Sequence, residues 1–559
     1  RGSQDQIAFN LRNHMGVDSV KMRDDKLGFT HTQDVVKIFL PRTYSDSELD
    51  SVTVYYQGNA TQGDFRSYFI ENHKEGRLLA TQSEPYGSSD WWPCKEDLND
   101  KFDSCDVIIT TDTGFLVGGA GTLVRNEQIN DSQVLYHWKH RYPSNFYLLA
   151  LAISNYQVIT DTVELRGNKV PIVNYVYPQS VGQARQRLKA TIPLMELYDS
   201  LFGAYPYMNE KYGHMQWNTS GGMEHATMSS MGNYSFDLIA HEVAHQWFGN
   251  KVTCSSWQDI WINESFATYL NAISYEFLLG KDTFVKELAK VFERAKREND
   301  LSIFVEDTST VKRIFNQDLS YQKGALVLHT LRFYIGDSAF FSACRSFLDD
   351  PNLAWKSAST ENFVRQLEKY TTKDVRSFIN HFYYGKGYPT YLVRYEQRPR
   401  GVVNFEISQS PSNPKTTFFK HSIPIEITLR NGQDTQLNID INSVFEKFSV
   451  SFPDDIETVE FNSFYDVMAT GTVAQIKSNN EAGVSAYPNP NDGILTIQGN
   501  KEVIKSVFIY DSQGKLVERQ HGFGKKVFVE IDISYLNSQV LMLVIETEKD
   551  NYVKKIYKN

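Results

Sequence analysis

The chain has 559 residues, of which 41% are hydrophobic and 22% charged, and its formal net charge is -10. This length predicts several domains, each with a hydrophobic core of its own. The acidic balance and the lack of a basic tract argue against nucleic acid as a ligand, and no apolar run approaches the roughly 20 residues of a membrane-spanning helix.

Residues 4–180 are predicted to form an all-β domain, because runs of β-branched and aromatic residues alternate with glycine-rich and polar turns. The clearest strand candidates are residues 35–40, 52–56, 107–111 and 146–152. Four cysteines in the whole chain are too few for a disulfide-built fold. Cys94 and Cys105 are close enough in sequence to form a disulfide in an oxidising compartment, and the sequence leaves this pairing open.

Residues 181–388 are predicted to form a mostly helical domain. Apolar residues recur at helical spacing over residues 181–198, and a further helix is expected over residues 319–329. Between these segments, residues 212–217 are a candidate strand. The two glycines that follow, Gly221 and Gly222, allow a backbone to approach a ligand closely.

Residues 236–250 are predicted to form a helix that ends at Gly249, and they contain a His-Glu-x-x-His motif. Because an α-helix turns once in 3.6 residues, His241 and His245 lie on the same face, where two neutral imidazoles can bind one metal ion. Glu242 lies beside them and can accept a proton from a metal-bound water.

A second helix is predicted over residues 257–269, with Glu264 near its start. The chain between His245 and Glu264 is long enough to turn and pass over the same metal ion. Two histidines and one carboxylate leave the fourth tetrahedral position of zinc for water, which is the arrangement of catalytic rather than structural zinc. The competing interpretation, a chance pair of core histidines, does not account for Glu264.

Residues 389–475 return to a period of two, which predicts a β-sandwich. The polar residues 476–485 are predicted to be a linker, and residues 486–559 to be a small domain of short strands and turns. The predicted fold class is therefore multidomain α+β.

Four stretches together resemble the zinc aminopeptidases of the aminopeptidase N and leukotriene hydrolase type, over roughly residues 4–470. They are the His-Glu-x-x-His motif with Glu264, the Gly-Gly-Met-Glu-His run at 221–225 in place of the family's Gly-x-Met-Glu-Asn, Tyr321 with the residues after it, and Glu84. The resemblance implies an N-terminal β-saddle, a thermolysin-like catalytic domain and a β-sandwich.

The same resemblance implies the roles of the site residues. One Zn2+ ion per chain is expected on His241, His245 and Glu264, with Glu242 as general base and Tyr321 stabilising the developing oxyanion. The substrate-binding residues are expected to be Glu84, Glu224, Gly221, Gly222 and Met223. A free α-amine is largely protonated at neutral pH, so Glu224 and Glu84 would bind it as a cation.

Two departures from the family pattern affect these expectations. His225 stands where the family has asparagine, which leaves one substrate contact undetermined. The β-pattern up to about residue 470 leaves no place for the long C-terminal helical domain of many members. A more open site that admits longer peptides is therefore expected.

The C-terminal residues 485–559 resemble the sorting domain of the type IX secretion system, with a generic β-sandwich accessory domain as the alternative. This resemblance implies export from a Gram-negative bacterium, to the medium or the cell surface, and the secretion machinery as a partner. Peptides with a free N-terminus are the expected substrates, and no nucleic acid and no membrane span are expected.

The predicted function is a secreted zinc-dependent aminopeptidase. Two enzymatic alternatives are an endopeptidase, which the amine-binding carboxylates argue against, and an aminopeptidase with an added epoxide hydrolase activity, which nothing in the sequence demonstrates. A third alternative is a non-catalytic peptide-binding surface protein on the same scaffold. Retention of all three metal ligands, Glu242 and Tyr321 argues against that third alternative.

Overall fold

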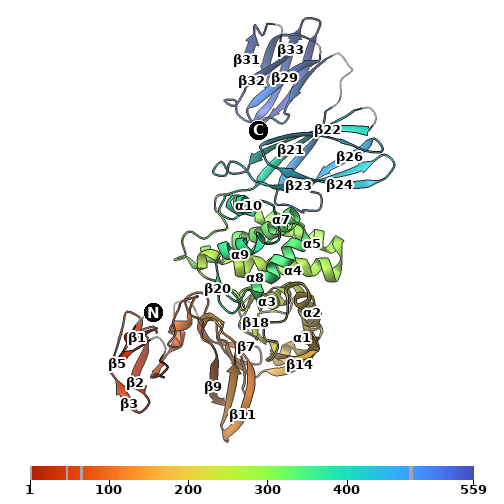
Figure 1. Cartoon of the computed structure of the whole chain (residues 1–559). Coiled ribbons are helices and arrows are strands. Elements are labelled where there is room, and N and C mark those ends of the chain that lie inside the picture. Colours follow the sequence, from red (N-terminus) through yellow and green to blue (C-terminus); the bar gives the residue numbers. More distant parts are fainter. Residues whose placement is uncertain are drawn as a thin grey trace. The chain divides into compact units, whose positions relative to one another are not determined.

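The computed structural model describes residues 3–45, 48–62, 67–398, 401–476, 483–500, 502–524 and 526–559. The chain is a multidomain α+β protein with a β-rich N-terminal region, a helical middle and C-terminal β domains (Figure 1). It divides into two compact units, one of residues 1–393, 407–446 and 457–473, the other of residues 394–406, 447–456 and 474–559.

The N-terminal region consists of short antiparallel sheets, as its alternating pattern predicts. Its strands are β1 (Gln4–Asn10), β2 (Met15–Met22), β3 (Asp25–Leu27), β4 (Phe29–Thr32), β5 (Val35–Tyr44), β6 (Thr53–Gly58), β7 (Tyr68–His73), β8 (Gly76–Thr81), β9 (Cys105–Asp112), β10 (Leu116–Gly119), β11 (Thr122–Asn130), β12 (Gln133–His140) and β13 (Leu151–Ser154). They pair in the orders β1-β5-β4, β3-β2-β6, β10-β13-β8-β7 and β11-β12-β9. All four cysteines of the chain are free thiols.

One of the predicted strands, residues 146–152, is wrong over its first half. Phe146–Leu148 form a 3-10 turn, and the strand β13 begins only at Leu151. All three residues of the turn are buried, so this apolar run lacks the alternation that distinguishes a half-buried strand. A short, wholly apolar run is compatible with either conformation.

A five-stranded sheet joins residues on both sides of position 180. Its order is β14 (Gln157–Leu165), β15 (Asn168–Val176), β16 (Tyr212–Gln216), β18 (Ser229–Met231) and β17 (Gly222–Met223). β15, β16 and β18 run parallel, and β17 pairs antiparallel with β18. The candidate strand at 212–217 is therefore present, while the domain boundary at 180 stays a prediction.

The helical middle has one buried core that continues into the β-strands before it. Its helices are α1 (Val181–Arg187), α2 (Thr191–Phe202), α3 (Phe236–Ala244), α4 (Trp261–Leu279), α5 (Lys281–Ala295), α6 (Val311–Ile314), α7 (Gly324–Ile335), α8 (Asp337–Asp349), α9 (Thr360–Leu367) and α10 (Val375–Phe382). Two short strands, β19 (Thr253–Cys254) and β20 (Ser357–Ala358), pair with each other. The predicted helix 181–198 is present as α1 and α2, joined by a 3-10 turn at Leu188–Ala190.

Helix α3 begins as predicted but ends earlier. The Ser235 hydroxyl caps its first turn by accepting a hydrogen bond from the Leu238 amide at 3.3 Å. The helix ends at Ala244, and the Asn250 amide then donates to the carbonyl of His245 at 3.0 Å. Gly249 has a positive φ of 122°, so the chain turns sharply here instead of running helical up to Gly249.

The C-terminal part is built from two pairs of sheets. The first pair contains β21 (Pro389–Gln397), β22 (Val402–Pro411), β23 (His421–Leu429), β24 (Asp434–Ile441), β25 (Phe445–Ser451), β26 (Ile456–Phe461) and β27 (Thr470–Gln475), in the orders β25-β22-β21-β27 and β24-β23-β26. The second pair contains β28 (Gly483–Tyr487), β29 (Ile494–Asn500), β30 (Ile504–Tyr510), β31 (Leu516–His521), β32 (Phe528–Asp532), β33 (Gln539–Thr547) and β34 (Asn551–Lys558).

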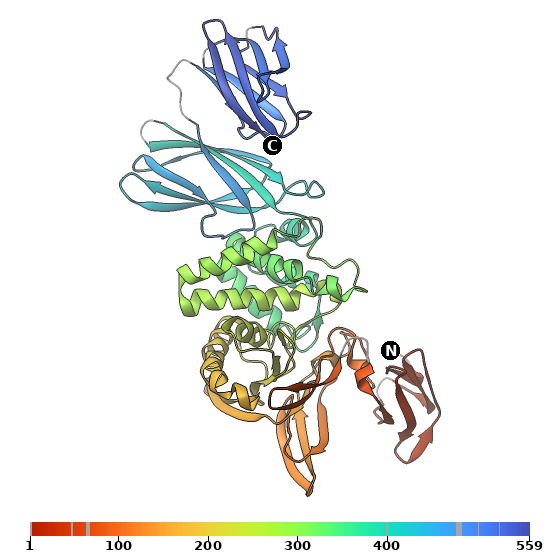
Figure 2. The same cartoon turned by 180° about the vertical axis from the view of Figure 1, so that it is seen from behind.

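These last strands form two sheets, β28-β29-β32 and β31-β30-β33-β34, around a hydrophobic core of their own (Figure 2). Residues 477–482, most of the predicted linker 476–485, lie outside the described residues. Among the described residues, no helix combines the length and the apolar character needed to cross a membrane.

Candidate active site

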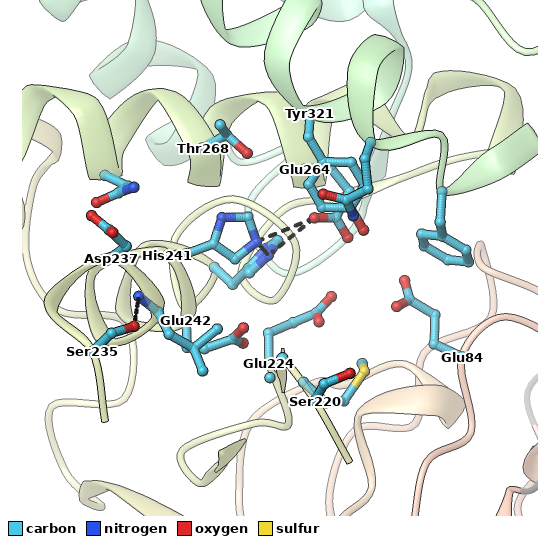
Figure 3. A pocket seen from close by; sticks show the side chains of 18 of the residues that line it. Glu84, Ser220, Glu224, Ser235, Asp237, His241, Glu242, Glu264, Thr268 and Tyr321 are labelled. Carbon is cyan, nitrogen blue, oxygen red and sulfur yellow. Dashed lines mark hydrogen bonds and ion pairs between the residues drawn. The ribbon is translucent and has the colours of Figure 1, made fainter. Parts of the chain in front are cut away.

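Side chains from α3 and α4 converge on one point, drawn in Figure 3. His241 lies on α3, and His245 follows one turn later at the end of this helix. Their Nε2 atoms are 3.0 Å apart, and the Glu264 Oε2 atom from the first turn of α4 lies 3.3 Å from His241 Nε2 and 3.5 Å from His245 Nε2. The structure thus brings together the three predicted metal ligands.

The early end of α3 orients His245. Its Nδ1 atom lies 3.0 Å from the carbonyl oxygen of Phe248. A carbonyl can only accept, so Nδ1 carries the proton and the lone pair of Nε2 points toward His241 and Glu264. A Cβ atom at Gly249 would lie 3.0 Å from Nδ1, so the glycine leaves room for the imidazole. The turn that the sequence pattern missed is therefore part of the site.

The donor set fits a zinc ion. Two imidazoles and one carboxylate are the ligands of catalytic zinc sites, and their donor atoms lie within 4.8 Å of one another. Burial lowers the pKa of His245, but the carboxylates of Glu224 and Glu264 outweigh it and raise this pKa to about 10. The surrounding charges therefore favour a positive charge where the three donor atoms meet.

Glu242 is buried, and its Oε2 atom has no hydrogen-bond partner. Burial and the nearby Glu224 and Glu264 carboxylates raise the pKa of Glu242 well above its usual range. A Cβ atom at Gly222 would lie 2.2 Å from Glu242 Oε1. Gly222 therefore makes room for this carboxylate, whereas the sequence suggested that it makes room for a ligand. Gly221 beside it has a positive φ of 85°.

Two further carboxylates lie next to Glu264. Glu84, in the loop after β8, and Glu224, just after β17, each have an oxygen within 4.8 Å of it and of each other. Both side chains have a buried Oε1 atom without a partner. Burial raises the pKa of Glu224 to about 7, and burial together with Glu224 raises that of Glu84 well above its usual range. Carboxylates that lie close together and have buried, unpartnered oxygens favour a cationic ligand.

Neighbouring side chains hold Glu224 in place. The Asn250 side-chain amide donates to the Glu224 carbonyl oxygen at 2.8 Å. Met223 is buried beside it and contributes to the cavity wall. His225, where the family has asparagine, is buried and its Nδ1 atom lies 3.0 Å from the Ser230 hydroxyl. His225 is not among the residues that line the cavity.

Tyr321 faces the cavity from a π-helical segment, η7 (Gln317–Lys323), where the sequence predicted an ordinary helix. Its ring stacks on the His241 imidazole, with the centroids 6.0 Å apart. Close packing holds the segment, because the Ser265 hydroxyl donates to the Ser320 carbonyl at 2.6 Å and a Cβ atom at Gly324 would lie 1.8 Å from Ser265 Oγ. Such π-helical turns are frequent at functional sites.

The predicted site residues line one cavity of about 630 Å³; they are Glu84, Gly221, Gly222, Met223, Glu224, His241, Glu242, His245, Glu264 and Tyr321. The sequence motifs did not identify a second group of lining residues, which lie on α3, α4, α6 and η7 and in the loops after β8, before β17, before α3 and before η7. They include Gln82, Ser220, Asn233, Ser235, Asp237, Leu238, Thr268, Asn271, Val311, Phe315, Gln317 and Gln322. Helical spacing from His241 and Glu264 would have found Asp237, Thr268 and Asn271, which lie on the same faces.

Two segments of the chain match known protein families. Residues 188–382 match the peptidase family M1 domain, and residues 485–559 match the secretion system C-terminal sorting domain. Residues 188–382 are thus similar to M1 peptidases, and the sorting domain that residues 485–559 match indicates export to the surface or the surroundings of a Gram-negative bacterium.

Curated relatives are aminopeptidases. The chain is 24% identical over 475 residues to the leucyl aminopeptidase of Saccharolobus solfataricus, covering 80% of this chain and 58% of that protein. It is 28% identical over 325 residues to the human endoplasmic reticulum aminopeptidase 1, covering 53% and 34%. The chain therefore spans about half the length of these relatives or less.

Solved structures share the fold. Legionella pneumophila aminopeptidase A, in complex with aspartic acid, is 17% identical with a TM-score of 0.69, over 84% of this chain and 55% of that chain. An M1 zinc metallopeptidase from Deinococcus radiodurans is 22% identical with a TM-score of 0.57, over 66% and 84%. At this identity the likeness concerns the fold alone.

Proposed function

We propose that this chain, with its M1 peptidase domain at residues 188–382, is an exported zinc aminopeptidase that removes N-terminal residues from peptides. The observation that carries the proposal is the position of the buried Glu224 and the half-buried Glu84, whose carboxylates lie within 4.8 Å of the candidate metal ligand Glu264 and each have a buried oxygen without a partner. They create a site for a cationic amine directly beside a metal-binding centre.

One zinc ion per chain is held by His241, His245 and Glu264. When bound, zinc supplies a Lewis acid that lowers the pKa of water toward 7 and polarises a carbonyl group. The ligands come from the end of one helix and the start of the next, and the Phe248 carbonyl fixes the orientation of His245. The site therefore requires little rearrangement to bind the ion.

Glu242 acts as the general base. It accepts the proton of the attacking water and passes it to the nitrogen of the leaving peptide. Its Oε2 atom is buried without a hydrogen-bond partner, so it is free to take up this proton. Gly222 allows the carboxylate to sit against β17 without a side chain in between.

Tyr321 donates its hydroxyl to the oxygen that becomes negative as water adds to the scissile carbonyl. Its pKa is raised by burial and by Glu264, so the hydroxyl keeps its proton and remains a donor. Loss of one oxyanion donor costs about 10²–10³ in kcat in another, unrelated peptidase.

Glu84 and Glu224 bind the protonated N-terminus of the peptide, and Gly221, Gly222 and Met223 border the bound backbone. A peptide with a blocked N-terminus leaves both carboxylates without a cation, which is costly in a buried site. This cost is what restricts the enzyme to the first residue and argues against endopeptidase action.

The architecture proposed for the chain is an N-terminal β-saddle of residues 4–180, a thermolysin-like domain of residues 181–388, a β-sandwich of residues 389–475 and a sorting domain of residues 486–559. Through the last domain the chain engages the type IX secretion machinery. The match of residues 485–559 to a secretion sorting domain supports this partner.

A panel of aminoacyl fluorogenic reporters, assayed with and without a chelator, tests the proposal. We expect release of the fluorophore that stops when zinc is removed and returns when zinc is added. A chain that binds zinc but hydrolyses no reporter and no free-amine peptide would instead be a peptide-binding protein on a peptidase scaffold.

A further inference from the structure

The cavity extends beyond the metal ligands, on the side away from Glu84. On α3, Asp237 lies one turn before His241, and on α4, Thr268 and Asn271 follow Glu264 at helical spacing. Residues four apart on a helix lie about 6 Å apart along its axis. Figure 3 shows Asp237 and Glu84 at opposite ends of the site, with His241 and Glu264 between them.

This far end offers hydrogen-bond acceptors that have no donor. Thr268 Oγ1 and Asn271 Oδ1 are buried without a partner, and Thr268 is only 7% exposed. Asp237 is exposed to solvent, and its Oδ1 atom accepts a hydrogen bond from the Tyr275 hydroxyl, which fixes the carboxylate between α3 and α4. Its pocket also contains Asn233 and Ser235, and none of the described residues that line the cavity is a lysine or an arginine.

We infer that the enzyme prefers peptides whose second residue is lysine or arginine, and that Asp237 binds this charged side chain with Thr268 and Asn271. The inference rests on the proposed function, because it takes the direction of the substrate from the amine site. With the N-terminus at Glu84 and Glu224 and the scissile bond at the metal ligands, the residue after the bond lies toward Asp237.

The distances agree with this placement. An extended peptide advances about 3.3–3.6 Å per residue, so the backbone of the second residue covers more than half of the helical turn of about 5.4 Å that separates the metal-binding centre from Asp237. A lysine or arginine side chain is long enough to reach Asp237 from there. The amide of Asn271 and the hydroxyl of Thr268 accept hydrogen bonds from neutral donors as well, so Asp237 is the residue that distinguishes a cation from a neutral polar group.

The test uses three free-amine peptides that differ only in the second residue, which is lysine, norleucine or glutamate. Norleucine has the carbon chain of lysine without the ammonium group. Because Asp237 is exposed, we expect kcat/KM to be about two- to fivefold higher for lysine than for norleucine, as an exposed ion pair predicts, and lowest for glutamate. In Asp237→Asn the lysine-to-norleucine ratio should approach one.

The matched control is Asp282→Asn, an exposed acid in the first turn of α5 that does not line the cavity, and it should keep the wild-type ratio. Because both peptides are assayed on the same protein, a partial loss of zinc or of folded enzyme cancels in the ratio. Thr268→Val, which keeps the shape of the side chain, should lower the ratio by a smaller factor and provides a second variant if Asp237→Asn folds poorly.

A wild-type ratio near one, with all three peptides hydrolysed, would overturn this preference and leave the aminopeptidase proposal standing. An unchanged lysine-to-norleucine ratio in Asp237→Asn would show that Asp237 does not bind the second side chain of the peptide. If wild type hydrolysed no free-amine peptide, the proposed function would fail and this inference with it.

Discussion

The active-site cavity and the C-terminal β domain both bury carboxylates, but only the domain satisfies them. Glu502 of the C-terminal domain is 3% exposed, and its two oxygens accept hydrogen bonds from the Thr547 hydroxyl at 2.6 Å and the Tyr552 hydroxyl at 3.0 Å. In the cavity, Glu224 and Glu242 are equally buried, and each has an oxygen without a partner.

Buried carboxylates with hydrogen-bond partners stabilise the fold, whereas buried carboxylates without partners are candidates for binding a ligand. In the described part of residues 483–559, no buried side-chain polar atom lacks a hydrogen-bond partner. An unpartnered buried carboxylate destabilises the folded chain, so it persists where a metal ion, a substrate or a proton transfer requires it. The cavity is therefore the functional region, and the C-terminal domain has a separate role.

The largest effect is expected from a metal ligand. His245→Ala removes one of three donors and should reduce the zinc content from about one ion per chain to little, together with the peptidase activity. Metal analysis after dialysis measures this, and circular dichroism checks that the β domains remain folded. Full zinc occupancy in this variant would rule out His245 as a ligand.

Next in size are the residues of the chemical step. Glu242→Gln cannot accept a proton and should lower kcat by about 10²–10⁴, and Tyr321→Phe, which loses one donor, by about 10²–10³. Both variants should retain zinc and change KM much less. Wild-type kcat in Tyr321→Phe would refute the oxyanion role.

A stability measurement sharpens the contrast between the two regions. Glu502→Ala removes the acceptor of two hydroxyl groups and should destabilise the C-terminal domain by about 1–3 kcal/mol, with no change in peptidase activity. Glu84→Gln replaces a carboxyl group that has a buried, unpartnered oxygen, and it should leave the unfolding free energy of the metal-free chain unchanged or higher. Denaturant unfolding curves of both variants provide the comparison. Equal destabilisation by both variants would show that the hydrogen-bonded and the unpartnered carboxylate contribute equally to stability.

The smallest effect is expected from removing the whole C-terminal domain. No proposed site residue lies beyond Tyr321, so a chain that ends before Ser485 should keep wild-type kcat/KM. In the source cell the same truncation should block export, because residues 485–559 match a secretion sorting domain. A folded but inactive truncated chain would show that these residues contribute to catalysis.

Much of the metal-binding centre could be predicted from the sequence, because its residues are close together in the chain and obey helical spacing. His241, His245 and Glu264 need only two short helices and one turn to meet. The alternating sequence pattern also predicts the strands at 35–40, 52–56 and 107–111, whose side chains alternate between exposed and half-buried or buried positions. These elements are predictable because each is determined by the residues next to it in the sequence.

The remaining features depend on tertiary contacts. The 3-10 turn at Phe146–Leu148 is buried on all sides, and the π-helical segment around Tyr321 depends on the packing of Ser265 and Gly324. The role of Gly222 depends on the position of Glu242, which comes from a different part of the chain and packs against it. Glu84 is far from the motif in sequence, so its role in the site could be inferred only from family resemblance.

The most direct test of the account is the ratio of kcat/KM for a free-amine peptide to that for its N-acetylated form, measured for wild type, Glu84→Ala and Glu224→Ala. We expect a large ratio in wild type. We expect each variant to lose at least about tenfold on the free-amine peptide, which narrows the ratio, because each carboxylate provides a charge-assisted hydrogen bond to the amine. Efficient cleavage of the acetylated peptide by wild type would contradict the account and indicate an endopeptidase.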